Sequence, residues 1–260
     1  MEAFTALSLF ITGLIAGTFG GFLGVGGGFI MLPTLSLLFG YQLTTAIGTT
    51  ITAIIFTAIS GALGHLKMNN VDFKTAKLIA ISGAFGAIIG SLAFFYLSKE
   101  LWLLSILLGI VFAYTSLRMI YEGLKREEFE KKAGQIQGSK KAKVMLGFFV
   151  GFLVGILGLG GGFALVPSFV YIFGSSIKLA VGTSLASFLS MAIVSSVFKI
   201  YQGVVDLIAV LFLGLGAIFG AQIGARLIVF APSWMLRLFF GTVFLYIAIR
   251  FILEGFYGIN

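Results

Sequence analysis

The chain has 260 residues, of which 59% are hydrophobic and 10% charged, and its formal net charge is +8. A soluble domain carries about 25% charged residues, so this composition excludes a water-soluble globular protein. The absence of cysteine excludes disulfides and thiolate centres, and the basic residues cluster at the ends of apolar runs, which favours topology signals over nucleic-acid binding.

Apolar runs of about the length of a membrane span recur along the chain. They lie at 4–23, 44–64, 75–97, 101–121, 144–157, 179–198, 204–229 and 234–253. A helix needs about 20 apolar residues to cross the hydrocarbon core, and long runs without strand-like alternation favour helices over a barrel. The sequence therefore predicts an all-α, multi-pass protein of the lipid bilayer. Its first run lacks a basic region and a cleavage site, so we expect a retained span rather than a signal peptide.

One glycine-rich motif occurs twice. It reads GVGGGFIMLP at 24–33 and GLGGGFALVP at 158–167, an offset of 134 residues that also aligns AIGTT at 46–50 with AVGTS at 180–184. Such duplication is typical of transporters built from internal repeats. We predict a first transmembrane repeat at 1–121, a basic cytoplasmic linker at 122–143 and a second repeat at 144–260.

The orientation of the two repeats depends on the short apolar runs at 27–40 and 161–174. If each run crosses the membrane, the repeats have five spans each and are inverted; if each is a re-entrant hairpin, they have four spans each and are parallel. The distribution of lysine and arginine does not separate these arrangements. The lack of basic residues beside Met1 and after Arg250 favours external termini, and with them the five-plus-five inverted arrangement.

The two glycine triplets predict broken helices. Each glycine costs about 1 kcal/mol relative to alanine in a helix interior, and the prolines at 33 and 167 remove a further hydrogen bond. Broken helices at membrane depth line protein or a watery cavity, and their free N–H groups bind anions. We expect the triplets to bind substrate; the alternative is close helix packing through small residues. The predicted substrate-binding glycines are Gly26, Gly27, Gly28, Gly160, Gly161 and Gly162.

The duplicated hydroxyl motif supplies a second set of candidate ligands. Thr49, Thr50, Thr183 and Ser184 are expected near the start of long spans, where hydroxyl groups and backbone N–H groups bind oxyanions. The alternative is helix capping, or bonding of the hydroxyl to the preceding turn.

Few ionisable or strongly polar residues fall within the apolar runs. His65 and Lys199 occupy equivalent positions near span ends; we expect them to snorkel to the interface, with lining of a polar cavity as the alternative. Gln222 and Arg226, one helical turn apart, are further candidate lining residues, and Asp72 and Asp206 are expected to cap helices. No carboxylate lies deep in a predicted span, which favours an anionic substrate over a metal or an amine.

The residues also provide no set for catalysis, metal binding or a cofactor, so an enzyme is not expected. The paired GxGGGFxxxP and AxGT(T/S) motifs resemble the TauE/SafE sulfite-exporter family, also called the TSUP permeases, over essentially the whole chain. The matching elements are Gly24, Gly26–Gly28, Pro33 and Gly48–Thr50, with Gly158, Gly160–Gly162, Pro167 and Gly182–Ser184 in the second half. The resemblance implies a permease of the cytoplasmic membrane for sulfur-containing anions such as sulfite, sulfonates or thiosulfate. A carrier for another small acid and a channel-like pore are the alternatives, and the oligomeric state is open.

Overall fold

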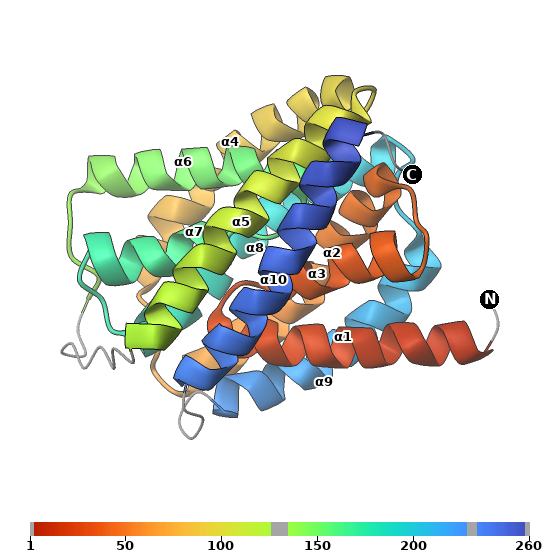
Figure 1. The fold of residues 1–260 in the computed structure, drawn as a ribbon. Coiled ribbons are helices and arrows are strands. Elements are labelled where there is room, and N and C mark those ends of the chain that lie inside the picture. Colours follow the sequence, from red (N-terminus) through yellow and green to blue (C-terminus); the bar gives the residue numbers. More distant parts are fainter. Residues whose placement is uncertain (1–2, 126–134, 228–232, 258–260) are drawn as a thin grey trace. The chain divides into compact units, whose positions relative to one another are not determined.

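The computed structural model describes residues 3–125, 135–227 and 233–257, and these residues form helices and no strands. The predicted all-α fold is therefore confirmed (Figure 1). The long helices are α1 (Ala3–Leu23), α3 (Leu43–Lys67), α4 (Phe73–Leu97), α5 (Leu101–Lys125), α6 (Lys140–Leu157), α8 (Ile177–Tyr201), α9 (Leu207–Leu227) and α10 (Ser233–Tyr257). Two short α-helices, α2 (Gly28–Pro33) and α7 (Gly162–Pro167), each continue into a π-helix, η1 (Thr34–Leu38) and η2 (Ser168–Ile172).

Six of the described helices are long and apolar enough to cross a membrane. They are α1, α3, α4, α5, α8 and α9, and the runs Gly28–Leu38 and Gly162–Ile172 are shorter apolar helices. Helix α5 continues to Lys125 and α6 begins at Lys140, so both helices reach into the predicted linker at 122–143. The middle of that linker, residues 126–134, lies outside the described residues.

The helices divide into two compact units that cut across the sequence repeats. The first comprises Met1–Phe94 and Glu130–Ile228, and the second comprises Phe95–Phe129 and Val229–Asn260. The first unit thus holds both glycine motifs and both hydroxyl motifs, whereas the second consists mainly of the last long helix of each half.

In the first unit, two parallel helix pairs pack through glycine. Helix α1 lies against α9, with Gly13, Gly17 and Gly21 facing Leu213, Ala217 and Ala221 in turn (Figure 1). Both series of residue numbers rise together, so the two helices run in the same direction. Helix α6 packs against α4 in the same way, since Gly147, Gly151 and Gly155 face Ile79, Gly83 and Ala87. Backbones approach this closely only where the Cβ atom is missing.

Helices α3 and α8 are equivalent in the two repeats and pack against each other in opposite directions. Ser196 Oγ donates to Thr52 Oγ1 at 2.9 Å, while toward the other end of α3 the Cβ of His65 lies 2.8 Å from the Cβ position of Gly182. Helix α3 also bonds to α9, where Ser60 Oγ donates to the Ile218 carbonyl at 2.7 Å. Helices α3 and α8 thus carry the two hydroxyl motifs through the interior of the unit.

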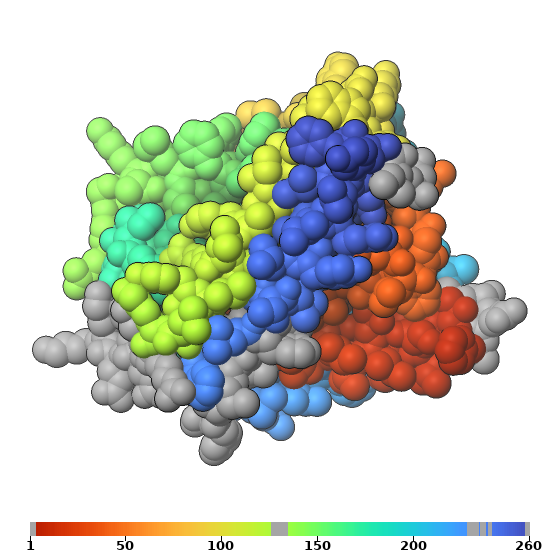
Figure 2. Space-filling view, in the orientation of Figure 1, coloured from red at the N-terminus to blue at the C-terminus, as the bar shows by residue number. Residues whose placement is uncertain are grey.

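In the second unit, α5 and α10 run antiparallel. The Cβ position of Gly109 lies 3.1 Å from the Ala248 carbonyl and that of Gly123 lies 3.0 Å from the Trp234 carbonyl. The space-filling view shows the two helices side by side as adjoining bands of side chains (Figure 2). Outward-facing apolar side chains such as Ile110, Leu117 and Ile249 suit a lipid environment.

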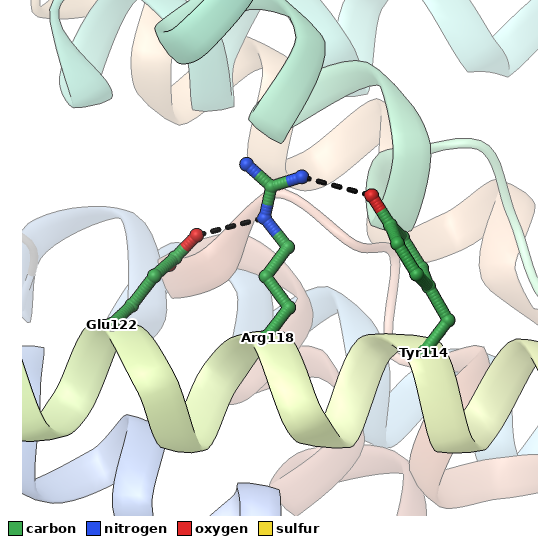
Figure 3. A network of polar contacts seen from close by, with 3 residues as sticks. All are labelled: Tyr114, Arg118 and Glu122. Atoms are coloured by element: carbon green, nitrogen blue, oxygen red, sulfur yellow. Dashed lines mark hydrogen bonds and ion pairs between the residues drawn. The ribbon is translucent and has the colours of Figure 1, made fainter.

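Helix α5 also holds a charged cluster near its end. Arg118 Nε donates to Glu122 Oε1 at 2.8 Å and Arg118 Nη1 donates to the Tyr114 hydroxyl at 3.0 Å (Figure 3). The three residues follow one another at intervals of one helical turn on one face of α5. Arg118 and Glu122 therefore pair their opposite charges within a single helix.

Candidate functional site

The glycine motifs break the helices where the sequence predicts. Helix α1 ends at Leu23 and α2 begins at Gly28, while α6 ends at Leu157 and α7 begins at Gly162. Gly27 has a φ of 83° and Gly160 a φ of 87°, in the left-handed region that favours glycine. Each break is followed by a short α-helix whose last residue is a proline, Pro33 or Pro167. Because proline has no backbone N–H group, one α-helical hydrogen bond is missing there, and the chain continues as a π-helical turn from the next residue.

The two glycine loops interlock. A Cβ atom at Gly28 would meet the carbonyl of Leu159, and one at Gly162 would meet the carbonyl of Gly24. Gly28 and Gly162 are equivalent at the offset of 134 residues, and their partners Leu159 and Gly24 differ by one position within the repeat, so each loop packs on the other repeat's loop.

The remaining triplet glycines are also tightly enclosed. The Cβ positions of Gly26 and Gly161 meet the Phe188 side chain at 2.5 and 2.9 Å, and that of Gly27 meets the Ala16 carbonyl at 2.5 Å. The Cβ position of Gly160 meets the Val25 carbonyl at 3.0 Å. Close packing therefore accounts for the absence of side chains, and substrate binding by the triplets stays a prediction.

The hydroxyl motifs lie in the second turn of their helices, not at the first residue. Helix α3 begins at Leu43, and the cap of α8 is Ser176, whose hydroxyl accepts from the Leu179 N–H. The alternative of helix capping by Thr49 and Thr183 is therefore wrong. Neither hydroxyl bonds to its own preceding turn, in contrast to Thr52, which donates to the Gly48 carbonyl at 2.8 Å.

Instead, each of these threonines accepts a hydrogen bond from the other repeat. The Asp72 N–H donates to Thr183 Oγ1 at 2.9 Å, and the Asp206 N–H donates to Thr49 Oγ1 at 3.0 Å. Both threonines are fully buried. Because an N–H group occupies an acceptor position of each oxygen, the hydroxyl hydrogen is left to be donated elsewhere.

The neighbouring hydroxyls differ between the repeats. Ser184 Oγ donates to the Gly24 carbonyl at 3.1 Å, which ties the second hydroxyl motif to the first glycine loop. Thr50 Oγ1 is buried and has no hydrogen-bond partner among the described residues. Thr57, two turns further along α3, is likewise buried without a partner, and its methyl group lies beside the Gly20 backbone. An unpaired buried hydroxyl is costly and marks a place where a ligand or water is accommodated.

His65 and Lys199 do not snorkel, because both side chains are fully buried. His65 Nε2 lies 2.9 Å from the Gly21 carbonyl, and Lys199 Nζ donates to the Gly155 carbonyl at 2.8 Å. Gly21 and Gly155 are themselves equivalent and lie in the last turn of α1 and α6. The expectation of interfacial side chains was wrong since the helix-end positions are covered by neighbouring helices of the same unit.

The other two candidate lining residues separate. Gln222 Nε2 donates to the Ser60 carbonyl at 2.6 Å and is half-buried between α9 and α3, whereas Arg226 is exposed. Only Gln222 is thus directed into the helix bundle.

The capping roles of the two aspartates are confirmed. Asp206 Oδ1 accepts from the N–H groups of Ile208 and Ala209 at 3.0 Å, and Asp206 Oδ2 accepts from the Tyr41 hydroxyl at 2.8 Å. Burial, with this bond and the charge of Asp206, raises the pKa of Tyr41 to about 12. Tyr41 precedes α3, so this bond joins the start of one repeat's hydroxyl helix to the other repeat.

Asp72 makes an additional contact with the linker. Its carboxylate accepts from Thr75 at the start of α4 and from the Ile136 N–H at 3.0 Å, and Lys143 Nζ donates to the Ile136 carbonyl. Burial raises the pKa of Asp72, but the bonds from Thr75 and Ile136 and the charge of Lys143 outweigh it and hold the pKa below its usual 3.8. The end of the linker is thereby fastened to the loop that bonds to Thr183.

Sequence reasoning did not find the bonds that Asp72 and Asp206 make across the repeats, nor the Arg118–Glu122 pair. The sequence did carry one signal for these bonds between repeats: Thr49 and Asp72 have the same spacing as Thr183 and Asp206.

These features define a class of protein: a helical membrane protein with duplicated broken helices and a buried polar region between its repeats, as in transporters. Comparison with known proteins identifies the group within that class. The family model described as sulfite exporter TauE/SafE matches residues 9–251, and the chain belongs to this family of membrane transporters.

Several curated relatives match along most of their length. The chain is 32% identical over 242 residues to the probable membrane transporter protein YunE of Bacillus subtilis, covering 84% of this chain and 87% of the relative. It is 27% identical over 231 residues to YdhB of the same organism, covering 89% and 92%. It is 25% identical over 233 residues to MJ0441 of Methanocaldococcus jannaschii, covering 84% and 85%. No solved structure matches.

Proposed function

We propose that this protein is a secondary permease of the cell membrane for small sulfur-containing oxyanions such as sulfite, sulfonates or thiosulfate. The observation that carries the proposal is the set of buried hydroxyls at Thr49, Thr50 and Thr183, whose O–H groups have no acceptor among the described residues. Oxyanions present several acceptor oxygens and no strong donors, so unspent O–H groups match them.

The nearby carboxylates do not oppose an anion at this place. The oxygens of Asp72 and Asp206 are turned to the caps of α4 and α9, and Lys143 lies close to the first of them. Lys199 places a nitrogen donor, and no carboxylate, in the interior of the same unit. The balance of buried groups favours an anion over a cation.

The packing of equivalent helices supports an inverted arrangement of two five-element repeats. Helix α3 runs antiparallel to α8, and within the second unit α5 runs antiparallel to α10. A repeat axis along the membrane normal would leave equivalent helices pointing the same way. An axis in the membrane plane reverses them, as in the inverted repeats of many carriers.

The first test is a thermal-shift screen of the purified protein against sulfite, thiosulfate, methanesulfonate, acetate and chloride. Binding to the folded state stabilises by mass action, so a substrate raises the melting temperature in a concentration-dependent way. A response to acetate alone would contradict the sulfur-oxyanion class.

In liposomes, saturable flux with counterflow is expected; ohmic single-channel currents would instead show a pore.

The second test removes the hydroxyls. Thr49→Val and Thr183→Val are expected to weaken binding of the responding anion by about tenfold each, with Thr49→Ser and Thr183→Ser close to wild type. Unchanged affinity in both valine variants, measured by calorimetry, would reduce the two threonines to a structural role.

A further inference from the structure

The two glycine loops follow one sequence plan but differ in backbone conformation at one equivalent pair of residues. Gly26 and its equivalent Gly160 are both left-handed, with φ of 84° and 87°. Gly27 is also left-handed, with φ of 83°, whereas its equivalent Gly161 has φ of -88°. Glycine adopts both regions about equally well, so at this position each loop can take the conformation of the other without backbone strain.

The packing of the loops on each other differs as well. The Cβ position of Gly28 meets the carbonyl of Leu159. That of the equivalent Gly162 meets the carbonyl of Gly24, which stands one position earlier within its repeat. The first and second loops therefore hold two alternative arrangements of the same backbone.

The starts of the loops, in contrast, lie against equivalent residues of α3 and α8. The Cβ position of Gly24 is 2.9 Å from the Cα of Val181 on α8. That of Gly158 is 2.7 Å from the carbonyl oxygen of Ile47 on α3, and Ile47 is the equivalent of Val181. The carbonyl groups of Gly24 and Gly158 thus occupy equivalent places beside the two hydroxyl motifs.

The hydroxyls that follow one helical turn later are used differently. Ser184 Oγ donates to the Gly24 carbonyl at 3.1 Å. Its equivalent, Thr50, is fully buried and its hydroxyl has no partner among the described residues, so it does not bond to the Gly158 carbonyl. One hydroxyl of the pair is therefore spent on a glycine loop, and the other is spare.

We propose that the two glycine loops exchange these conformations during transport, so that Thr50 and Ser184 alternate as the spare hydroxyl that donates to the anion. This inference rests on the proposed function and on its inverted arrangement of repeats. In the exchanged state, Thr50 bonds to the Gly158 carbonyl and Ser184 is released from Gly24. An axis in the membrane plane interchanges the two faces of the membrane, so the exchanged state presents the site to the opposite face.

The exchange predicts opposite effects for two matched variants. Ser184→Ala removes a hydrogen bond from the described state and only a spare hydroxyl from the exchanged one. Thr50→Val removes a spare hydroxyl from the described state and a hydrogen bond from the exchanged one. Each variant is expected to move the ratio of the two states by about three- to tenfold, in opposite directions, because one net hydrogen bond is lost from one state alone.

Fluorine NMR of the purified protein in detergent measures this ratio without any anion. The chain has no cysteine, so a single introduced cysteine carrying a trifluoromethyl label is a unique reporter. Leu38→Cys and Ile172→Cys place it at equivalent, exposed positions at the ends of η1 and η2. Two resonances are expected, or one averaged resonance, whose populations or position move oppositely in Ser184→Ala and Thr50→Val.

Ser187→Ala is the matched control on α8. Ser187 is fully buried, but its Oγ donates to the Thr183 carbonyl within the same helix, so this bond is the same in both states. Its ratio, and that of Thr50→Ser, should stay within about twofold of wild type. Shifts in the same direction in Ser184→Ala and Thr50→Val, or spectra that neither variant moves, would overturn the exchange. Should Ser184→Ala fail to fold, Thr50→Val against Thr50→Ser decides, and a difference below twofold overturns it.

The anion arm separates this inference from the proposed function. Sulfite counterflow in liposomes is expected to fall at least about tenfold in the double variant of Thr50→Val and Ser184→Ala, because neither state then has a spare hydroxyl. Wild-type counterflow in that double variant would overturn the alternation. Opposite spectral shifts in a protein that responds to no sulfur oxyanion would support the exchange of the loops and reject the proposed function.

Discussion

The hydrogen bond from the Asp72 N–H to Thr183 gives a quantitative prediction for stability. Thr183 is fully buried and Asp72 is 8% exposed, so water does not replace the hydroxyl when it is removed. Thr183→Val keeps the shape of the side chain but leaves a buried N–H group without an acceptor. Such a loss costs about 1–3 kcal/mol, and we expect the free energy of unfolding to fall by this amount.

The equivalent change in the other repeat is milder. Asp206 is half-buried, so its N–H group regains part of its hydrogen bonding from solvent after Thr49→Val. We expect a loss of about 0.5–1.5 kcal/mol, and the double variant should show the sum of the two losses within about 0.5 kcal/mol because the bonds share no residue.

Denaturant unfolding in detergent micelles, followed by circular dichroism, measures these differences. Thr183→Ser is the control, since it retains the hydroxyl oxygen and loses only a methyl group. The expected order of stability is wild type and Thr183→Ser, then Thr49→Val, then Thr183→Val. Equal stability of Thr183→Val and Thr183→Ser would show that the bond across the repeats contributes nothing, and would refute the reasoning.

Three further predictions concern the contacts around the two repeats. Gly162→Ala should abolish assembly of the folded protein, scored by size-exclusion chromatography, because its Cβ would overlap a backbone carbonyl. Gly61→Ala should fold, because the nearest atom to its Cβ position is a leucine methyl at 3.0 Å and the nearest backbone atom lies at 3.7 Å. The lowered pKa of Asp72 means that its contribution to stability is complete above about pH 3.8 and is lost as the pH falls below it. Asp72→Asn should therefore be less stable than wild type at pH 7 and lose less stability on acidification to pH 3, measured by denaturant unfolding. Tyr41→Phe should remove from the ultraviolet titration one tyrosine that ionises at about pH 12, because burial and Asp206 disfavour its anion; a difference spectrum centred at pH 10 would contradict this.

The helices and their breaks could be predicted from the sequence because both depend on local chemistry. Three consecutive glycines cannot sustain a helix, and the structure ends α1 and α6 at the predicted places. Long apolar runs predicted the remaining helices for the same reason, since in lipid the backbone must satisfy its own hydrogen bonds. The duplication then predicted that equivalent residues have equivalent surroundings.

The partners of the polar residues could not be predicted in this way. Thr183 bonds to a residue 111 positions away, and no local pattern reports a contact at that separation. Lys199 illustrates the same limit for burial. A lysine near the end of an apolar run is usually interfacial, and only the packing of α4 and α6 around α8 encloses its side chain.

The enclosed glycine loops change how a transport defect in a glycine variant is to be interpreted. Gly27→Leu is expected to abolish flux, but its Cβ would meet the Ala16 carbonyl at 2.5 Å, so the same result follows from lost packing or from lost binding. The hydroxyl variants do not share this ambiguity, because valine fills the space of threonine and removes only hydrogen bonding. If the affinity for the anion falls in Thr49→Val by more free energy than the folded protein loses in stability, the Thr49 hydroxyl contacts the ligand. No glycine variant can show such a contact, because each one also disturbs packing.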